Sequence, residues 1–318
     1  MCIALITTAH PSYPLILINN RDEYLTRPTA PAAWWDEPHS HVLGGRDLQR
    51  DVRGTWLGIT KQGRVAVLTN FREEGQNFSG VRSRGSIVNA FLTTPPDSQE
   101  TTEQFAKRLV EEEGVKDVGG FSLVFGRLRP PTSRRNDGLA VVSNRTPNVQ
   151  GLTWIANKPG LVHGLSNSHY GDQTWPKVVR GQRLLEERVR ESAEADEDKE
   201  SLIRHLFDLL HTDTLPSPKD EEDLEVYLRQ LRNSIFIPAI GGQGNDDKPG
   251  DSVAAANNAE PVRTISGVYG TQKQAVILVD HNGRVTFVER TLFDQDGRPV
   301  AEGRGDRKFE FDIEGWST

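Results

Sequence analysis

Residues 1–24 read MCIALITTAHPSYPLILINNRDEY and carry the strongest structural signal in the chain. Two apolar, β-branched runs, Cys2–Thr8 and Leu15–Asn19, flank the turn-forming segment His10–Pro14. This pattern predicts a hairpin of two antiparallel strands. Both runs are nearly continuous in apolar residues, which is typical of strands that are covered on both faces of their sheet.

The same pattern recurs along the chain, in an order that predicts the fold class. Strands are expected at Trp56–Thr60, Arg64–Leu68, Phe121–Phe125, Leu139–Ser143, Leu152–Ala156, Leu161–Leu165, Gln274–Asp280 and Arg284–Arg290. Helices are expected at Ile87–Leu92, Glu103–Glu113, Lys177–Glu194, Leu202–His211 and Asp220–Leu231. Strands, helices and strands follow one another without β–α alternation. The order predicts an α+β domain in which two antiparallel sheets pack together with helices outside.

Composition limits the class of protein. Lys+Arg 38 against Asp+Glu 45 gives 38 − 45 = −7, which argues against a nucleic-acid binder. The single cysteine excludes an internal disulfide framework and cysteine-rich zinc sites, and we expect no metal. No run approaches the ~20 apolar residues of a transmembrane helix. Residues 1–318 are therefore expected to form one domain of a soluble, cytoplasmic protein, with a mobile insertion at Gly241–Glu260, and they carry no signal for an oligomeric state.

Cys2 directly follows the only methionine in the protein. Cellular aminopeptidases remove Met1 when the next residue is small, so the mature chain is expected to begin with a cysteine. An α-amine has a pKa of roughly 7.7–8.0, so part of it is free base at neutral pH. One residue then supplies both nucleophile and base. The alternative is that Cys2 is a small apolar residue that opens a strand.

The polar segment Asn19–Glu23 follows the second apolar run, so it lies at a strand end beside Cys2. Arg21 is a candidate for lowering the thiol pKa. Asp22 is a candidate for orienting the α-amine, and Asn20 for donating a hydrogen bond to a developing oxyanion. The alternative is a structural cluster of polar side chains that closes the hairpin.

Two adjacent tryptophans, Trp34 and Trp35, lie in the proline-rich segment Pro31–Pro38. Two neighbouring tryptophans are not expected to be buried together on a regular element. They are candidates either for walling an apolar ligand pocket or for anchoring a loop. Four arginines near glycines are candidates for clamping phosphates or carboxylates, namely Arg46, Arg72, Arg82 and Arg84.

A set of short motifs follows in register along the chain: MCIALIT, NNRDEY, Gly44–Asp47, Gly54–Gly58, Thr69–Arg72, Ser83–Gly85, Gly120–Leu123, Gly164–Asn167, Trp175–Lys177 and Tyr269–Thr271. Together they resemble the NRDE family, also called the Transport and Golgi Organization 2 family. The resemblance covers essentially the whole chain apart from the insertion. Its N-terminal pattern is similar to the choloylglycine-hydrolase and acyltransferase branch of the Ntn hydrolases, which implies a four-layer αββα sandwich.

The resemblance also implies roles for individual residues. Cys2 matches the nucleophile, Asp22 the strand-end aspartate and Asn167 the asparagine that completes the oxyanion hole. Arg263 matches a distal arginine. In those hydrolases an arginine lies three positions before the aspartate, where this chain has Asn19. Arg21 directly precedes Asp22 instead, and because side chains alternate along a strand we expect it to point away from Cys2.

The family's biology implies an intracellular protein of haem or acyl-CoA lipid homeostasis, with mitochondrial or Golgi-associated pools beside the cytoplasmic one. We expect it to bind a small amphipathic ligand, haem or acyl-CoA, in a cleft beside Cys2, and to require no cofactor. The expected lining residues are Asn19, Asn20, Arg21, Glu23, Trp34, Trp35 and Asn70. The alternative is an N-terminal cysteine amidohydrolase or acyl-thioester hydrolase that uses Cys2 as its nucleophile.

Overall fold

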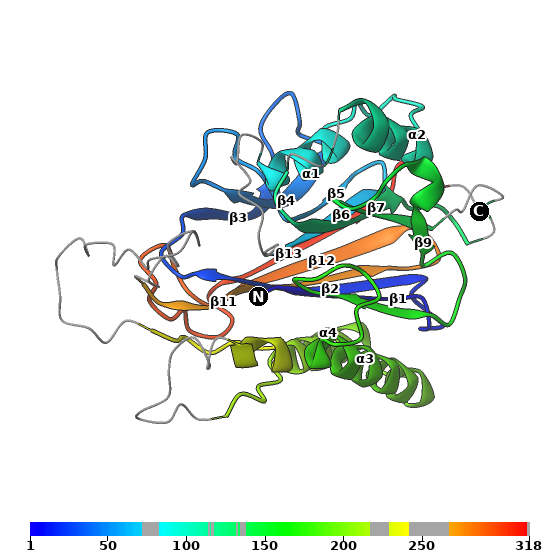
Figure 1. The fold of residues 1–318 in the computed structure, drawn as a ribbon. Coiled ribbons are helices and arrows are strands. Elements are labelled where there is room, and N and C mark those ends of the chain that lie inside the picture. Colours follow the sequence, from blue (N-terminus) through cyan, green and yellow to red (C-terminus); the bar gives the residue numbers. More distant parts are fainter. Residues whose placement is uncertain are drawn as a thin grey trace, which may run out of the picture.

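Two antiparallel sheets stack face to face, and helices cover the outer face of each (Figure 1). α1 (Arg84–Leu92) and α2 (Thr102–Lys107) lie on one outer face, and α3 (Pro176–Glu194) and α4 (Lys199–Leu210) on the other. The predicted four-layer αββα sandwich is therefore confirmed. This computed structural model describes residues 1–71, 83–113, 115, 118–131, 133, 138–216, 229–241 and 267–316.

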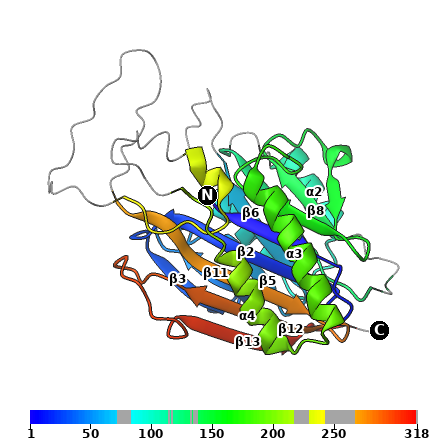
Figure 2. The same cartoon turned by 90° about the horizontal axis from the view of Figure 1, so that it is seen from below.

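The first sheet contains both N-terminal strands. Its six strands run in the order β10-β1-β2-β11-β12-β13, and every neighbouring pair is antiparallel. Figure 2 shows α3 and α4 lying across this sheet. The strand bounds are β1 Ile3–Thr7, β2 Leu15–Tyr24, β10 Val162–Leu165, β11 Tyr269–Val279, β12 Arg284–Thr291 and β13 Asp306–Asp312.

The second sheet is a meander of seven strands in chain order, β3 to β9. Its strand bounds are β3 Thr29–Trp34, β4 Val42–Asp47, β5 Leu57–Thr60, β6 Arg64–Asn70, β7 Phe121–Arg127, β8 Leu139–Ser143 and β9 Thr153–Ile155. The predicted strands at Trp56–Thr60, Arg64–Leu68 and Phe121–Phe125 correspond to β5, β6 and β7. The sequence did not predict β3, β4 or β13.

Alternation along β1 explains why its run is continuously apolar. Ile3 and Leu5 pack against the α3–α4 layer, whereas Ala4 and Ile6 pack between the two sheets. All four side chains are fully buried. Removing apolar surface from water stabilises the folded state by about 25 cal/mol per Å². A strand that is buried on both faces therefore contributes buried apolar surface to two layers of the core. The interpretation that these strands are covered on both faces is confirmed.

The helices begin at local capping signals. Asp198 accepts hydrogen bonds from the Glu200 and Ser201 amides at the start of α4. Thr101 and Gln104 form a reciprocal capping box at the start of α2. The helix predicted at Glu103–Glu113 divides into α2 and a π-helical segment, Arg108–Glu112.

Several predictions fall on parts of the chain that the structure does not describe. Beyond Gly241, the insertion predicted at Gly241–Glu260 lies outside the described residues, as do Arg263, Arg72 and Arg82. Most of the helix predicted at Asp220–Leu231 does so as well. In the part of the chain that is described, no helix is long and apolar enough to cross a membrane.

Ion pairs at the surface connect the edge strand β13 to α4. Lys199 Nζ lies 2.5 Å from Glu310 Oε1, and Lys308 Nζ lies 2.5 Å from Glu200 Oε1. The hydrogen bond from Lys199 and its charge lower the pKa of Glu310 from 4.5 to about 2. The pairs therefore link strand and helix more strongly at neutral than at acid pH.

We expect the Glu310→Gln variant to be slightly less stable than the parent near neutral pH. A carboxyl group whose pKa is lowered by folding contributes stability above its unfolded pKa and loses that contribution as pH falls toward its folded pKa. The stability difference should therefore shrink between pH 4.5 and about 2. Urea denaturation over this pH range tests it, and a difference that does not change with pH would contradict it. Because the pair is exposed, added salt should reduce the difference at neutral pH.

Candidate functional site

The register of β1 on β2 determines which polar side chains meet at the N-terminus. Ile3 lies opposite Asn20, so even-numbered residues at this end of β2 face the α3–α4 layer and odd-numbered ones face the second sheet. Asn20 Nδ2 donates to the carbonyls of Leu210 and Ile235 on the helical side. Asp22 shares this side of the sheet.

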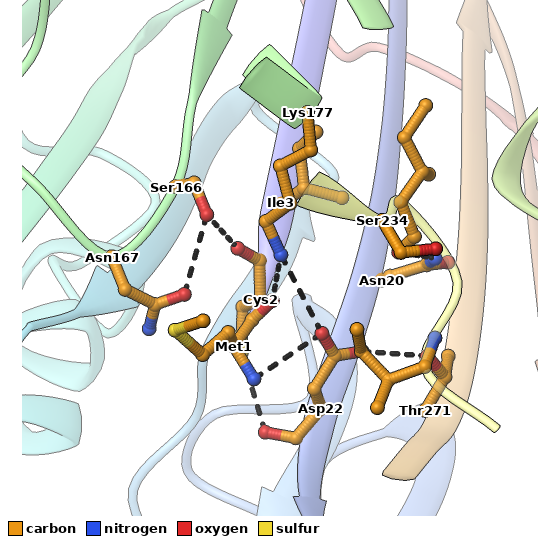
Figure 3. Close-up of polar contacts among 12 residues, drawn as sticks. Met1, Cys2, Ile3, Asn20, Asp22, Ser166, Asn167, Lys177, Ser234 and Thr271 are labelled. Carbon is orange, nitrogen blue, oxygen red and sulfur yellow. Dashed lines mark hydrogen bonds and ion pairs between the residues drawn. The ribbon is translucent and has the colours of Figure 1, made fainter. Parts of the chain in front are cut away.

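Asp22 lies at the centre of a largely buried polar cluster (Figure 3). Thr271 donates a hydrogen bond of 2.7 Å to Asp22 Oδ1. The N-terminal ammonium of Met1 lies 3.3 Å from Asp22 Oδ2, and Lys177 Nζ lies 3.8 Å from the same oxygen. The side chains of Asp22 and Lys177 are both 0% exposed. Two cations, the Met1 ammonium and the Lys177 side chain, therefore lie against the buried Asp22 carboxylate.

Lys177 reaches this cluster from the first turn of α3. Trp175 is the N-cap and Pro176 the first helical residue. A helix N-terminus carries partial positive charge and disfavours a buried cation. Lys177 is nevertheless completely buried, donates to the Met1 carbonyl and pairs with Asp22. Burial lowers the pKa of Lys177, and the Asp22 carboxylate opposes that shift.

Cys2 lies beside the cluster and is connected to a second set of polar groups. Its Sγ lies 3.6 Å from the Asp22 carbonyl oxygen. Ser166 Oγ donates to the Cys2 carbonyl at 2.6 Å and also lies 3.3 Å from Asn167 Oδ1. Burial raises the pKa of the Cys2 thiol, whereas the N-terminal ammonium and Arg21 oppose the rise. The half-buried thiol therefore loses its proton less readily than an exposed thiol while Met1 is present.

Asn167 and Asn70 complete the surroundings of Cys2. Asn167 Nδ2 donates to the main-chain carbonyl of Asn70, at the end of β6. An amide nitrogen carries two hydrogens, so one donor of Asn167 is not used by any residue that the structure describes. Asn70 Oδ1 is buried and accepts no hydrogen bond from any described residue. Two expected site residues, Asp22 and Asn167, are thus brought to Cys2, and Asn70 joins them through Asn167.

Arg21 points between the sheets, on the face opposite to Asp22. Its guanidinium lies 4.5 Å from the Trp56 ring and donates to Gln272, and it lies 3.9 Å from Asp47. Asn19 is buried on the same face and donates to the carbonyls of Ile3 and Asn20. Asn19 therefore links β2 to β1, whereas Arg21 links β2 to β11 and to the second sheet.

The remaining expected ligand-binding residues have structural partners. Glu23 lies 3.7 Å from Arg27 and accepts a hydrogen bond from the Tyr24 amide. Both donor bonds of Asn20 go to main-chain carbonyls, so Asn20 anchors the end of α4 to β2. Arg263 lies outside the described residues.

The expected proline-rich loop begins as a strand, because Trp34 is the last residue of β3 and Trp35 follows it. Trp34 ends β3, and the two rings pack on opposite sides of the second sheet. Trp34 packs between the sheets against Phe311, at 5.0 Å. Trp35 is 7% exposed, packs beneath α1 and donates to the Gly44 carbonyl. Strand alternation buries two adjacent aromatic rings in different layers.

Sequence reasoning missed Lys177, Thr271, Tyr269 and Ser166 as members of the site. Tyr269 donates to the Asp22 carbonyl at 3.2 Å and contacts the Met1 ammonium. All four residues occur in the motifs Trp175–Lys177, Tyr269–Thr271 and Gly164–Asn167. The available signal was chemical: a lysine directly after a proline that starts a helix, where acidic residues are favoured.

Some solved structures show low similarity to this chain. A mutant of the conjugated bile acid hydrolase from Clostridium perfringens is 12% identical with a TM-score of 0.37, covering 100% of this chain and 95% of that chain. Penicillin V acylase from Agrobacterium tumefaciens is 12% identical with a TM-score of 0.38, covering 98% and 86%.

Sequence relatives are considerably closer. An uncharacterized protein of Saccharomyces cerevisiae is 31% identical over 332 aligned positions, covering 98% of this chain and 100% of that protein. The Transport and Golgi organization 2 homolog of Mus musculus is 30% identical over 289 positions, covering 90% and 89%. A family model described as Transport and Golgi organisation 2 matches residues 1–294. The resemblance found in the sequence motifs is confirmed, and the chain belongs to the Transport and Golgi organisation 2 family.

Proposed function

We propose that the chain, once Met1 is removed, hydrolyses an amide or thioester bond with Cys2 as its nucleophile. The observation that carries this proposal is the fully buried pair of Asp22 and Lys177, which contacts the main chain of the residue preceding Cys2. Burying an ion pair costs several kcal/mol per ion in desolvation, which apolar residues of similar size avoid. A pair retained at this place supports a chemical role for the N-terminus.

Loss of Met1 converts the peptide nitrogen of Cys2 into a free α-amine. The carbonyl carbon of Met1 is bonded to this nitrogen, so a group that contacts the Met1 oxygen lies beside the new amine. Lys177 is such a group, and Asp22 pairs with it. The amine therefore has the Asp22 carboxylate to orient it. The Lys177 ammonium is a like charge that disfavours protonation of the amine.

The proposed reaction uses only groups of this chain and water. The α-amine takes the thiol proton, and the Cys2 sulfur attacks the substrate carbonyl to form a carbon–sulfur bond. The oxyanion accepts a hydrogen bond from the remaining donor of Asn167. The ammonium then protonates the leaving nitrogen or sulfur as its bond to the carbonyl carbon breaks. Water, deprotonated by the same amine, releases the acyl group as a carboxylic acid and restores the thiol.

The second candidate function is reversible binding of an amphipathic ligand, haem or acyl-CoA, beside Cys2 in a cytoplasmic protein of lipid or haem homeostasis with mitochondrial or Golgi-associated pools. The observation that favours it is the buried thiol. Burial raises the pKa of Cys2, so the sulfur is mainly a neutral, weakly nucleophilic thiol as long as Met1 is retained. In this case Cys2 contributes to binding, and no acyl-enzyme forms.

Intact-mass spectrometry distinguishes the two functions. We expect the protein made in cells to lack Met1, and incubation with a panel of acyl-CoAs and N-acyl amides to add one acyl mass that disappears with time. The Cys2→Ala variant is the control and should acquire no acyl mass. Retention of Met1 in a preparation that turns over substrate would exclude the amine as base. Reversible adducts without any acyl-enzyme would favour the binding function.

A further inference from the structure

A cavity of about 490 Å³ opens at the end of the sandwich opposite to Cys2. Cys2 precedes β1, whereas Thr8, which lines this cavity, follows it. At about 3.3 Å per residue, the six residue steps from Cys2 to Thr8 separate the two sites by roughly 20 Å. The volume falls within the range of about 300–1,000 Å³ that is typical of small-molecule sites.

The inner wall of the cavity is apolar and continuous with the core between the sheets. Leu15, Leu139 and Val279 line it and belong to that core. Trp316 lines it as well and is fixed by a hydrogen bond of 2.9 Å from its Nε1 to the His281 carbonyl. The cavity is therefore an open end of the inter-sheet layer, with an indole as one wall.

The polar lining of the cavity carries an excess of positive charge. Arg127, Arg129 and Lys158 all line it. Within the described parts of the chain, none of the three forms an ion pair with a carboxylate. Among the described residues, the guanidinium of Arg127 donates to the Gln62 carbonyl, at 3.1 Å. Burial lowers the pKa of Arg127, and the neighbouring Arg129 lowers it further.

We propose that this cavity binds an apolar monocarboxylate, with the carboxylate held by Arg127 and Arg129 and the hydrocarbon against Leu139, Val279 and Trp316. Guanidinium groups bind carboxylates through paired, charge-assisted hydrogen bonds. A bound anion also relieves the repulsion between the two arginines. The site is independent of Cys2, because it lies beyond the opposite end of β1.

Fluorescence titration of the full chain with 11-(dansylamino)undecanoic acid tests this site. Arg129→Glu should weaken binding at least about tenfold, as expected for losing a charge-assisted hydrogen bond and gaining repulsion. Arg304→Glu makes the same charge change at an exposed residue outside the cavity and should leave the affinity within about twofold. Arg129→Gln provides a milder variant if the glutamate lowers the melting temperature.

Two further measurements locate the probe. Trp316→Phe should reduce energy transfer from tryptophan to the dansyl group, and the corresponding dansyl alcohol should bind more weakly than the acid. Equal effects of Arg129→Glu and Arg304→Glu, or equal affinities for acid and alcohol, would overturn the proposal. Cys2→Ala should not change the affinity. If it abolishes binding, the probe occupies the Cys2 site, and the proposed cavity site is wrong while the proposed hydrolase remains open.

Discussion

Substituting Asp22 with alanine is expected to lower the free energy of unfolding by about 3–5 kcal/mol, the cost of leaving one member of a buried ion pair without its partner. Asp22 and Lys177 are both 0% exposed, so no water replaces the missing carboxylate. Thr271 also loses the acceptor of its hydrogen bond. Urea denaturation followed by circular dichroism measures the loss.

Asp312→Ala is the matched control, because Asp312 is also a strand aspartate in an ion pair, with Arg284, but its side chain is 72% exposed. An exposed pair contributes about 0–1 kcal/mol, so this variant should remain close to the parent. Asp22→Asn separates charge from packing, since the amide oxygen still accepts from Thr271. Equal losses for Asp22→Ala and Asp312→Ala would mean that the buried cluster does not stabilise the N-terminus.

Regular hydrophobic patterns made most of the fold predictable. The continuous runs of β1 and β2 belong to strands buried on both faces, and the alternation of their side chains follows directly from the sequence. β13, Asp306–Asp312, was missed because its residues are largely exposed and charged, and it is stabilised by pairing with β12. β3 and β4 were missed because their glycines, prolines and alanines resemble a loop.

The candidate site was predictable only where residues lie next to Cys2 in the hairpin or match a family motif. Asp22 follows from strand pairing, and Asn167 from the resemblance. Lys177 could not be predicted in the same way, because it enters from the first turn of a helix far along the chain. No local sequence pattern predicts that this helical turn packs over the N-terminus. The contact depends on how α3 lies across β1 and β10, which is a property of the complete sandwich.

Substituting Lys177 with methionine is expected to shift the pH dependence of hydrolysis to higher pH. Burial lowers the pKa of the Met1 ammonium, Asp22 raises it and the Lys177 charge lowers it. We expect the same groups to act on the Cys2 α-amine once Met1 is removed. Methionine fills a similar volume without the charge, so Lys177→Met removes one of the two lowering effects and the pKa of the amine should rise. The amine must be unprotonated to accept the thiol proton. At pH values well below the pKa of the amine, each unit of increase in that pKa therefore lowers the rate about tenfold.

Lys273→Met is the matched control for this shift. Lys273 is another buried lysine, on β11 rather than on a helix, and lies 3.2 Å from Glu289, with both side chains no more than 4% exposed. Breaking this pair should cost a similar 3–5 kcal/mol of stability, because Glu289 also remains buried. It lies on the inter-sheet side, away from the α-amine, so the pH profile should keep its midpoint.

The comparison of kcat/KM against pH for the two variants separates positioning of the base from stability alone. A shift of the acidic limb in Lys177→Met but not in Lys273→Met supports the assignment of the α-amine as the base and of Lys177 as the residue that keeps it unprotonated. The same profile in both variants would mean that Lys177 only fills the space beneath the N-terminus and balances the charge of Asp22. The base would then be another group, because the Lys177 charge would have no influence on the proton that the base transfers.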